Sequence, residues 1–174
     1  MITLNSDAAS TSLSKTTKAI LNEYGIKLNK NLGQNYLIDR NKRDQIIQFG
    51  NLTKDDVVLE IGPGIGTLTI ELAKRVKKVI AIEQDSNICQ ILENRLKKEN
   101  IDNVELINDD ALNVEFPKFD KIISNLPYQI SSPITFKFLN YDFQLAILMY
   151  QKEFASRMNG KVGSKDYSLS LIHI

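Results

Sequence analysis

The sequence predicts an α/β fold in which a mainly parallel β-sheet carries helices on both faces. Two observations lead to this prediction. Five short apolar runs recur along the chain, and segments whose apolar residues fall at helical spacing lie between them. A glycine-rich turn directly follows the first apolar run, at the point where a strand of such a sheet gives way to a helix.

The predicted strands are short and rich in Val, Ile and Leu, which is the composition of strands covered on both faces. In chain order they are Val57–Leu59, Val79–Ile82, Val104–Ile107, Lys121–Ser124 and Leu145–Tyr150. Because helical segments separate them, each strand is expected to run parallel to its neighbours.

The predicted helices alternate with these strands. A short helix is expected at Lys15–Tyr24, where Gly25 ends it, and a second at Asn41–Phe49, for which Asp39 or Asn41 is available as the N-terminal cap. The remaining three are Leu68–Val76, Ile88–Leu96 and Pro133–Leu139.

Length and composition fit a single globular domain. The chain has 174 residues, of which 43% are hydrophobic, and this is enough for one buried core. We expect a disordered tail over residues 1–14 and one domain over residues 15–174. No apolar stretch has the length of a membrane span and no secretory signal is recognisable, which favours a cytoplasmic protein.

Cysteine and histidine are each present once, as Cys89 and His173. The chain therefore cannot form an internal disulfide, and no Cys/His metal cluster is expected. Cys89 is interpreted as a small core residue on a helix.

Polar or glycine residues follow four consecutive predicted strands. They are Gly62, Gly64 and Gly66 after the first strand, Glu83 after the second, Asp109 and Asp110 after the third, and Asn125 after the fourth. Any one of them could be an ordinary turn or cap residue. In a parallel sheet the carboxyl ends of the strands share one edge, where ligands bind, so the set predicts a common site.

The type of cofactor follows from the spacing and the charge. The dinucleotide fingerprint G-x-G-x-x-G is not met, because position 67 is Thr and the last glycine is Gly66. Glu83 is placed to accept hydrogen bonds from both hydroxyls of a ribose. Asp110 can accept one from an adenine amine, and Glu60 beside the glycine turn suits a sulfonium and an amino-acid tail. This acidic set favours a cationic cofactor, S-adenosylmethionine.

The turn Asn125-Leu126-Pro127-Tyr128 suggests the chemistry. The exocyclic amine of adenine is a weak nucleophile because its lone pair is delocalised into the ring. Hydrogen bonds from this amine to the Asn125 side-chain oxygen and the Leu126 carbonyl would free the lone pair for attack on a methyl group. Tyr128 can stack on one face of the base and Phe154 on the other.

The N-terminal part of the chain is basic. We expect it to neutralise phosphates of a nucleic acid, although a solvated polar face explains the charge equally well. The basic residues concerned are Lys27, Lys30, Arg40, Lys42 and Arg43.

Together these motifs resemble the ribosomal RNA adenine N6-dimethyltransferases, a family that includes the macrolide-resistance methylases of large-subunit RNA. The resemblance runs from about Lys15 to Tyr167 and implies a class I S-adenosylmethionine-dependent methyltransferase fold, which is Rossmann-like. It is carried by residues 32–39, 60–69, 83, 110–112, 125–128 and 151–157.

The resemblance also implies roles for individual residues. Cofactor binding is implied for Gln34, Asn35, Leu37, Glu60, Gly62, Gly64, Gly66, Glu83, Gln84, Asp110, Ala111 and Asn125. Catalysis and base stacking are implied for Asn125, Leu126, Pro127, Tyr128 and Phe154.

Residues 129–134 and 163–167 are most similar to the small-subunit branch of archaea and eukaryotes. This branch implies dimethylation of two adjacent adenosines near the 3′ end of small-subunit rRNA, by a monomer acting on a pre-ribosomal particle. Members of the family continue with a hairpin and a small helical domain. Residues 168–174 depart from their pattern, so we expect both features to be truncated here and a sheet edge to be exposed.

Two other functions stay open. The same chemistry could act on large-subunit RNA, DNA adenine or a protein glutamine amide, although Leu126 in place of a second proline argues against the last two. Alternatively the protein could be a non-catalytic assembly or transcription factor that binds RNA or DNA on the same fold. The presence of Glu83, Asp110 and Asn125 argues against that function.

Overall fold

The computed structural model describes residues 39–160 together with Leu37 and six positions of the N-terminal segment, namely 15, 17, 19, 20, 22 and 23. These six positions are helical, in agreement with the helix expected there. The tail expected at residues 1–14 and the C-terminal residues 161–174 lie outside the described residues. No helix in the described part of the chain is long and apolar enough to cross a membrane.

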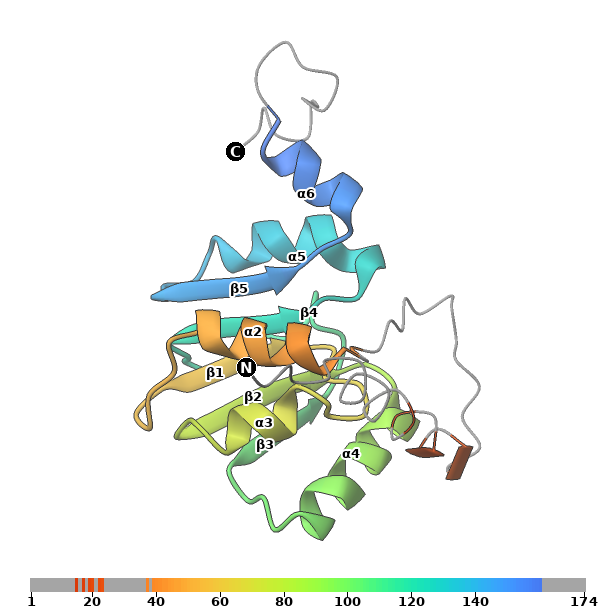
Figure 1. Cartoon of the computed structure of the whole chain (residues 1–174). Coiled ribbons are helices and arrows are strands. Elements are labelled where there is room, and N and C mark those ends of the chain that lie inside the picture. The colour runs from red at the N-terminus through yellow and green to blue at the C-terminus, as the bar shows by residue number, and fades with distance from the viewer. Residues whose placement is uncertain are drawn as a thin grey trace, which may run out of the picture.

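A five-stranded sheet in the order β3-β2-β1-β4-β5 forms the centre of the molecule, and every neighbouring pair is parallel (Figure 1). Its strands are β1 (Val57–Ile61), β2 (Lys78–Glu83), β3 (Val104–Asn108), β4 (Lys121–Asn125) and β5 (Leu145–Met149). The predicted parallel α/β fold is therefore confirmed. Chain order reverses between β1 and β4, and such a switch point opens a crevice at the carboxyl ends of the two strands.

Side chains alternate strictly between the two faces of the sheet, so both faces are buried. On β1, for example, Val58 packs into one apolar cluster, while Leu59 and Ile61 pack into the cluster on the opposite face. This alternation explains why the strands read as continuous apolar runs.

Helices α2 (Arg40–Phe49), α3 (Thr69–Ala73) and α4 (Ser86–Lys98) cover one face. Asp39 caps α2 by accepting from the backbone N–H groups of Asn41 and Lys42, so the first of the two expected caps is the one used. Asp85 caps α4 in the same way. Cys89 lies on α4 and is buried, as expected.

The other face is covered by α5 (Ser131–Phe138) and by the loop between β3 and β4, which contributes the aromatic pair Phe116 and Phe119. Two elements were not expected. A single 3₁₀ turn, η2 (Tyr128–Ile130), precedes α5, and helix α6 (Lys152–Met158) follows β5 and extends away from the sheet (Figure 1).

A buried ion pair joins the amino ends of the two strands that flank the switch point. Lys121 Nζ, at the start of β4, lies 2.9 Å from Asp56 Oδ2, directly before β1, and also donates to the Asn51 carbonyl at 2.7 Å. Both charged side chains are less than a tenth exposed, so removing either partner alone would leave a buried charge.

Candidate active site

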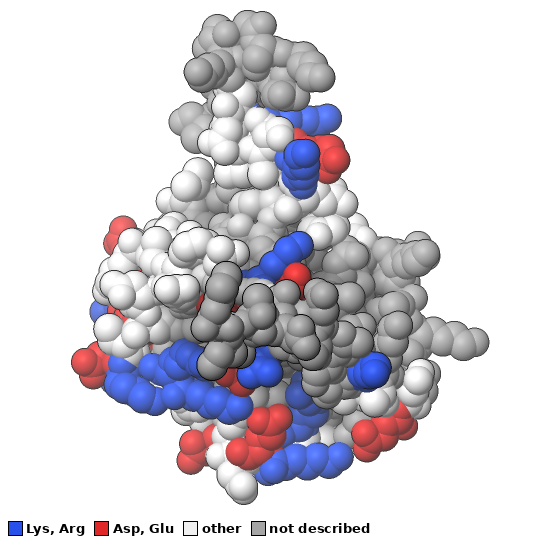
Figure 2. Space-filling view, viewed as in Figure 1, with Lys and Arg blue, Asp and Glu red and all other residues white. Residues whose placement is uncertain are grey.

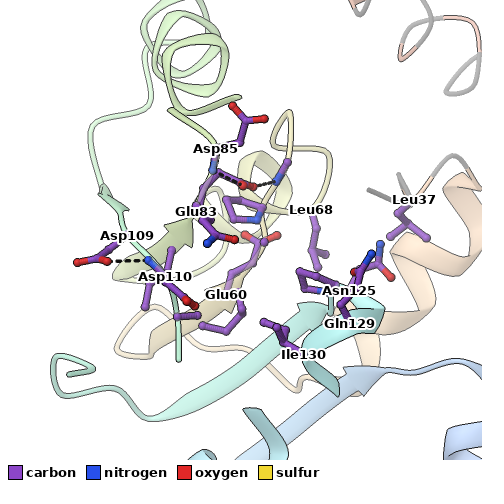
Figure 3. Close-up of a pocket in the computed structure, with 18 of the residues that line it drawn as sticks. Leu37, Glu60, Leu68, Glu83, Asp85, Asp109, Asp110, Asn125, Gln129 and Ile130 are labelled. Carbon is purple, nitrogen blue, oxygen red and sulfur yellow. Dashed lines mark hydrogen bonds between the residues drawn. The ribbon is translucent and has the colours of Figure 1, made fainter. Parts of the chain in front are cut away.

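A cavity of about 390 Å³ opens at the carboxyl ends of the strands, beside the switch point (Figure 3). It brings together most of the predicted site residues: Leu37, Glu60, Gly62, Gly64, Glu83, Gln84, Asp110, Ala111, Asn125 and Pro127. Four motifs that are far apart in the sequence thus form one site, because their strands end at the same edge of the sheet.

The glycine turn packs directly against the Asn-Leu-Pro-Tyr turn. Gly62 has a φ of +66°, and a Cβ at this position would lie 2.8 Å from Pro127 Cγ. The backbone N–H of Gly62 donates to the Ile82 carbonyl at 2.9 Å. Only glycine satisfies both the backbone angle and the close approach, which sets the width of the cavity at this point.

Glu83, the last residue of β2, has its carboxylate fixed by two backbone groups. The N–H of Gly64 donates to Oε2 at 3.2 Å and the N–H of Asp85 to Oε1 at 3.0 Å. Burial raises the pKa of Glu83 while these two hydrogen bonds oppose the shift. Each carboxylate oxygen keeps a lone pair that can accept a further hydrogen bond from a pair of hydroxyls.

Glu60 lies deeper in the same cavity. It is 2% exposed, and its Oε2 has no hydrogen-bond partner among the described residues. Burial raises the pKa of Glu60 to about 8, and the nearby charge of Glu83 acts in the same direction. A buried carboxyl group with an unused oxygen is suited to pair with a cationic or hydrogen-bond-donating ligand group.

Asp110 follows β3 and closes a turn with its own carboxylate. Oδ1 accepts from the N–H of Leu112 at 2.9 Å, and Oδ2 accepts from the Asn113 side-chain amide at 3.1 Å. The side chain of Asp109 points away from the cavity centre and accepts from the N–H of Asp110 at 2.7 Å (Figure 3). Asp110 is therefore held in one orientation and retains acceptor capacity for a ligand amine.

The cavity wall is acidic. Carboxyl groups of Glu60, Glu83, Asp85, Asp109 and Asp110 line it, and no Lys or Arg of the described residues does so. A diphosphate would be repelled by this wall, whereas a sulfonium with an α-ammonium group would be attracted. The donor and acceptor set therefore fits S-adenosylmethionine better than a dinucleotide. No cluster of three or more metal-ligating side chains is present in the part of the chain that the structure describes.

The Asn-Leu-Pro-Tyr turn begins at the end of β4, where Asn125 lies in register with Met149 of β5. Asn125 and Pro127 line the cavity, while the Leu126 side chain is 1% exposed and anchors the turn in the core. The turn continues into η2, where the N–H of Ile130 donates to the Pro127 carbonyl at 3.2 Å. Tyr128 is half-buried and lies outside the cavity wall.

Phe154 lies on α6, in the segment that follows β5. Its ring centroid is 5.0 Å from that of Tyr150 with an interplanar angle of 33°, and the Tyr150 hydroxyl contacts the Thr135 hydroxyl of α5 at 2.6 Å. Phe154 does not line the cavity either. The two aromatic residues expected to stack on a base therefore belong to the elements that follow β4 and β5, not to the cavity itself.

Gly66 does not line the cavity, contrary to its expected role as a cofactor contact. It has a φ of +84°, and a Cβ there would lie 2.4 Å from Leu92 Cδ1 of α4. Gly66 therefore allows the turn to pack closely on α4, and it affects the cavity only by holding the turn in place.

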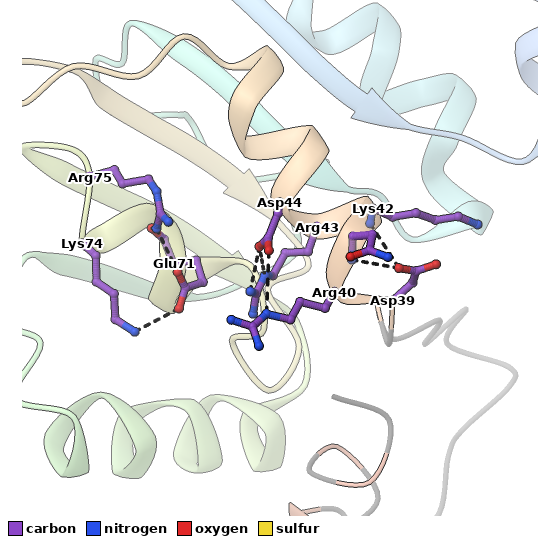
Figure 4. A network of polar contacts seen from close by, with 9 residues as sticks. Asp39, Arg40, Lys42, Arg43, Asp44, Glu71, Lys74 and Arg75 are labelled. Atoms are coloured by element: carbon purple, nitrogen blue, oxygen red, sulfur yellow. Dashed lines mark hydrogen bonds and ion pairs between the residues drawn. The ribbon is translucent and has the colours of Figure 1, made fainter. Parts of the chain in front are cut away.

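The expected basic residues divide into two groups. Arg40 and Lys42 are exposed on the first turn of α2, whereas Arg43 is buried, and its guanidinium donates to Asp44 Oδ1 through two nitrogens at 2.9 and 2.7 Å (Figure 4). Arg43 therefore stabilises the fold and is unsuited to the phosphate contact expected of it. Lys27, Lys30, Gln34 and Asn35 lie outside the described residues.

Several cavity residues were not predicted. Asp85 lies two positions beyond Glu83, and Gln129 and Ile130 directly continue the Asn-Leu-Pro-Tyr turn. Because these residues adjoin predicted motifs in the sequence, their position could have indicated that they line the cavity. Leu68, expected as a helix residue and as part of the segment 60–69 that resembles a cofactor loop, also lines the cavity.

Comparison with known proteins places these features in a family context. The sequence matches the family described as Ribosomal RNA adenine dimethylase over residues 25–173. A protein of Methanosphaera stadtmanae named Probable ribosomal RNA small subunit methyltransferase A is 57% identical over 152 residues, which make up 87% of this chain and 56% of that protein. Its namesake in Methanothermobacter thermautotrophicus is 56% identical over 87% of this chain and 55% of that protein. The chain thus spans about half the length of the curated relatives it matches.

Two solved structures are similar in fold and sequence. A dimethyladenosine transferase from Plasmodium falciparum matches with a TM-score of 0.72 and 42% identity, covering 78% of this chain and 50% of that one. The 23S rRNA methyltransferase ErmE matches with a TM-score of 0.66 and 34% identity, covering 74% of this chain and 53% of that one.

Proposed function

This chain belongs to the ribosomal RNA adenine dimethylase family, and on that basis we propose that it transfers methyl groups from S-adenosylmethionine to the N6 amines of two adjacent adenosines near the 3′ end of small-subunit rRNA. One observation carries the proposal: an acidic cavity at the switch point of the sheet is bordered by Asn125 and Pro127 of the Asn-Leu-Pro-Tyr turn.

The cavity residues hold the cofactor in a defined direction. Glu83 accepts hydrogen bonds from the two ribose hydroxyls, and Asp110 with Ala111 contacts the adenine. Glu60 faces the cationic methionine end of the cofactor. The resemblance implies that Gln34 and Asn35 also contact this end. When bound, S-adenosylmethionine supplies a methyl group made electrophilic by the adjacent sulfonium.

The chain's own contribution to the reaction is made by the Asn-Leu-Pro-Tyr turn. The Asn125 side-chain oxygen and the Leu126 carbonyl accept the two hydrogens of the target amine, which turns its lone pair out of the ring plane. Pro127 fixes the turn against Gly62, so these acceptors are held in place before the base arrives. No strong general base is required, because the amine loses its proton only after methylation has made it acidic.

Tyr128 and Phe154 hold the target base. Stacking on an aromatic side chain is worth about 1–3 kcal/mol per unpaired base. Both rings belong to elements that directly follow strand ends of the sheet, η2 after β4 and α6 after β5. We expect a base held between them to present its N6 amine to Asn125.

The names of the curated relatives, at 56–57% identity, favour small-subunit rRNA as the substrate. The similarity to ErmE is a specific observation in favour of a second candidate, large-subunit rRNA. We propose a monomeric enzyme that acts in the cytoplasm on a pre-ribosomal particle, since adenosines near an rRNA end are accessible before assembly is complete.

The product test uses small-subunit particles from cells that lack this modification. The protein is incubated with the particles and isotope-labelled S-adenosylmethionine, and the rRNA is digested to nucleosides for mass spectrometry. We expect label in N6,N6-dimethyladenosine. A parallel reaction contains large-subunit rRNA in place of the small-subunit particles, and label in that RNA alone would support the second candidate. RNA binding without cofactor binding would identify a non-catalytic protein and refute the proposal.

A further inference from the structure

Lys137, on α5, lies outside the cavity and beneath the loop that follows β3. Its Nζ donates to the carbonyls of Ala111 at 2.9 Å, Leu112 at 3.2 Å and Val114, and it lies 4.3 Å from the centroid of the Phe116 ring. An ammonium group has three N–H donors, so these three carbonyls satisfy all of them. Among the described residues Lys137 forms no ion pair.

The loop that Lys137 holds is the turn that presents Asp110. Asp110 closes the front of this turn, because its Oδ1 accepts from the N–H of Leu112 and its carbonyl accepts from the N–H groups of Asn113 and Val114 at 2.9 and 3.0 Å. The carbonyls of Ala111 and Leu112 point the other way, toward α5. Lys137 closes this rear end with charge-assisted hydrogen bonds, which are stronger than neutral ones.

The two segments that Lys137 connects are opposite walls of one cavity. The loop after β3 supplies Asp110 and Ala111 to the wall, and Gln129 and Ile130, which lead directly into α5, supply the wall after β4. In the described part of the chain, no other hydrogen bond or ion pair joins α5 to residues 110–114.

We propose that Lys137 is a positioning residue that sets where Asp110 and Ala111 stand relative to the Asn-Leu-Pro-Tyr turn, and thereby determines how selectively the site accepts an adenine base of the cofactor. This inference rests on the proposed function. Lys137 touches no ligand itself, and it acts through the carbonyls that it binds.

The test compares two ligands that differ only at the base, S-adenosylhomocysteine and S-inosylhomocysteine. The inosyl ligand has a carbonyl oxygen where adenine has its amine, so this position accepts rather than donates, and a site built to accept a hydrogen bond there should reject it. Affinities are measured by calorimetry for wild type, Lys137→Met and the control Lys118→Met, an exposed lysine of the same loop region.

We expect Lys137→Met to weaken S-adenosylhomocysteine binding by about tenfold and the inosyl ligand much less, so that the ratio of the two affinities falls toward 1. Lys137→Arg, which keeps a charged donor, should restore part of the ratio, and Lys118→Met should leave it unchanged. In turnover assays KM for S-adenosylmethionine should rise while kcat at saturation stays near that of the wild type.

An unchanged affinity ratio in Lys137→Met, or an equal loss for both ligands, would overturn the inference, because a residue that merely stabilises the fold has no reason to affect one base more than the other. If Lys137→Met is too unstable for titration, Lys137→Gln is judged by the same ratio. Failure of the wild type to bind S-adenosylhomocysteine would instead refute the proposed function.

Discussion

Among the acidic residues that line the cavity, Glu60 has the least exposed side chain. It is 2% exposed, and burial raises its pKa to about 8. The free protein therefore holds a proton on Glu60 at neutral pH. A cationic ligand group placed beside this carboxyl would favour its ionised form, so ligand binding and proton release are coupled at this residue.

This shift has a consequence for stability. Between the ordinary value of 4.5 and about 8, the folded protein binds a proton at Glu60 that the unfolded chain has released, so stability falls as pH rises through this window. Glu60→Gln mimics the protonated form and should remove that part of the pH dependence. By pH 8 the ligand-free variant should melt above the wild type by at least about 2–4 °C, which corresponds to 1 kcal/mol for a domain of this size.

Thermal unfolding of the ligand-free protein across this pH range provides the measurement. Glu153→Gln, a change of the same kind at an exposed position of α6, is the control and should follow the wild type. A Glu60→Gln curve parallel to the wild-type curve would show that Glu60 is ionised in the folded protein and would contradict this account.

For individual residues, the sequence predicted which side chains lie at the ends of strands, but not how deeply a side chain is buried or which distant groups it contacts. Glu83, Asp110 and Asn125 could be placed because each follows an apolar run, and strand ends converge in any parallel sheet. The burial of Arg43 could not be predicted, because it depends on the tertiary packing of α2, even though its partner Asp44 is the next residue in the sequence. The same holds for Lys137, whose three partners lie in another loop.

Among the elements, helix α4 contacts the glycine turn on the side opposite the cavity. A Cβ at the Gly66 position would lie 2.4 Å from Leu92 Cδ1, so Leu92 would have to move, and Arg95 of α4 donates to the Ile65 carbonyl of the same turn. Helix α4 thus holds the turn that borders the cofactor site.

Gly66→Ala is expected to destabilise the protein by about 2–5 kcal/mol, since a positive φ costs a non-glycine residue about 1–2 kcal/mol and overpacking typically adds about 1–3 kcal/mol. Denaturant unfolding of Gly66→Ala, Leu92→Ala and the double variant separates the two contributions. In the double variant the clash is relieved, so its loss should be smaller than the sum of the single losses. Strict additivity would show that the contact with Leu92 is not the cause.

Element boundaries departed from the sequence prediction for identifiable reasons. Helix α3 ends at Ala73, short of the predicted Val76, where the Asn103 side-chain amide binds the carbonyls of Ala73 and Val76 from a distant part of the chain. Helix α5 begins before Pro133, because proline is tolerated in the first turn of a helix. Helix α6 was not predicted, because no side-chain N-cap marks its start.

At the scale of the whole molecule, the strand order explains why motifs from residues 60 to 130 meet. The order β3-β2-β1-β4-β5 places β1 and β4 side by side at the centre, with the acids of β2 and β3 on one side and the Asn-Leu-Pro-Tyr turn on the other. Alternating strands and helices predicted a parallel sheet but not this order, which is fixed by tertiary packing.

Charge is mixed on one face of the described part of the molecule. On the face shown in Figure 2, Lys and Arg side chains lie among Asp and Glu side chains. We therefore expect RNA binding to depend on particular exposed residues on this face. Arg40 and Lys42 are the candidates, because α2 begins close to Leu37 of the cavity wall.

Arg40→Gln combined with Lys42→Gln should weaken rRNA binding and lower the slope of log affinity against log salt by about 1–2, as expected for the loss of two phosphate contacts. The matched control is Lys54→Gln with Lys118→Gln, which removes the same charge from exposed positions near the amino ends of β1 and β4, opposite the cavity. Equal slopes for the two double variants would show that the first turn of α2 makes no phosphate contacts.

In the proposed reaction, a methyl donor in the acidic cavity and an adenine amine at the Asn-Leu-Pro-Tyr turn meet at one edge of the sheet. The most direct test is single-turnover methyl transfer to small-subunit rRNA by Asn125→Ala, together with the affinity of this variant for S-adenosylhomocysteine. We expect a rate lowered by about 10²–10³-fold, as for loss of a preorganised polar group, with affinity changed by less than about threefold. An unchanged rate, or a loss of affinity as large as the loss of rate, would contradict it.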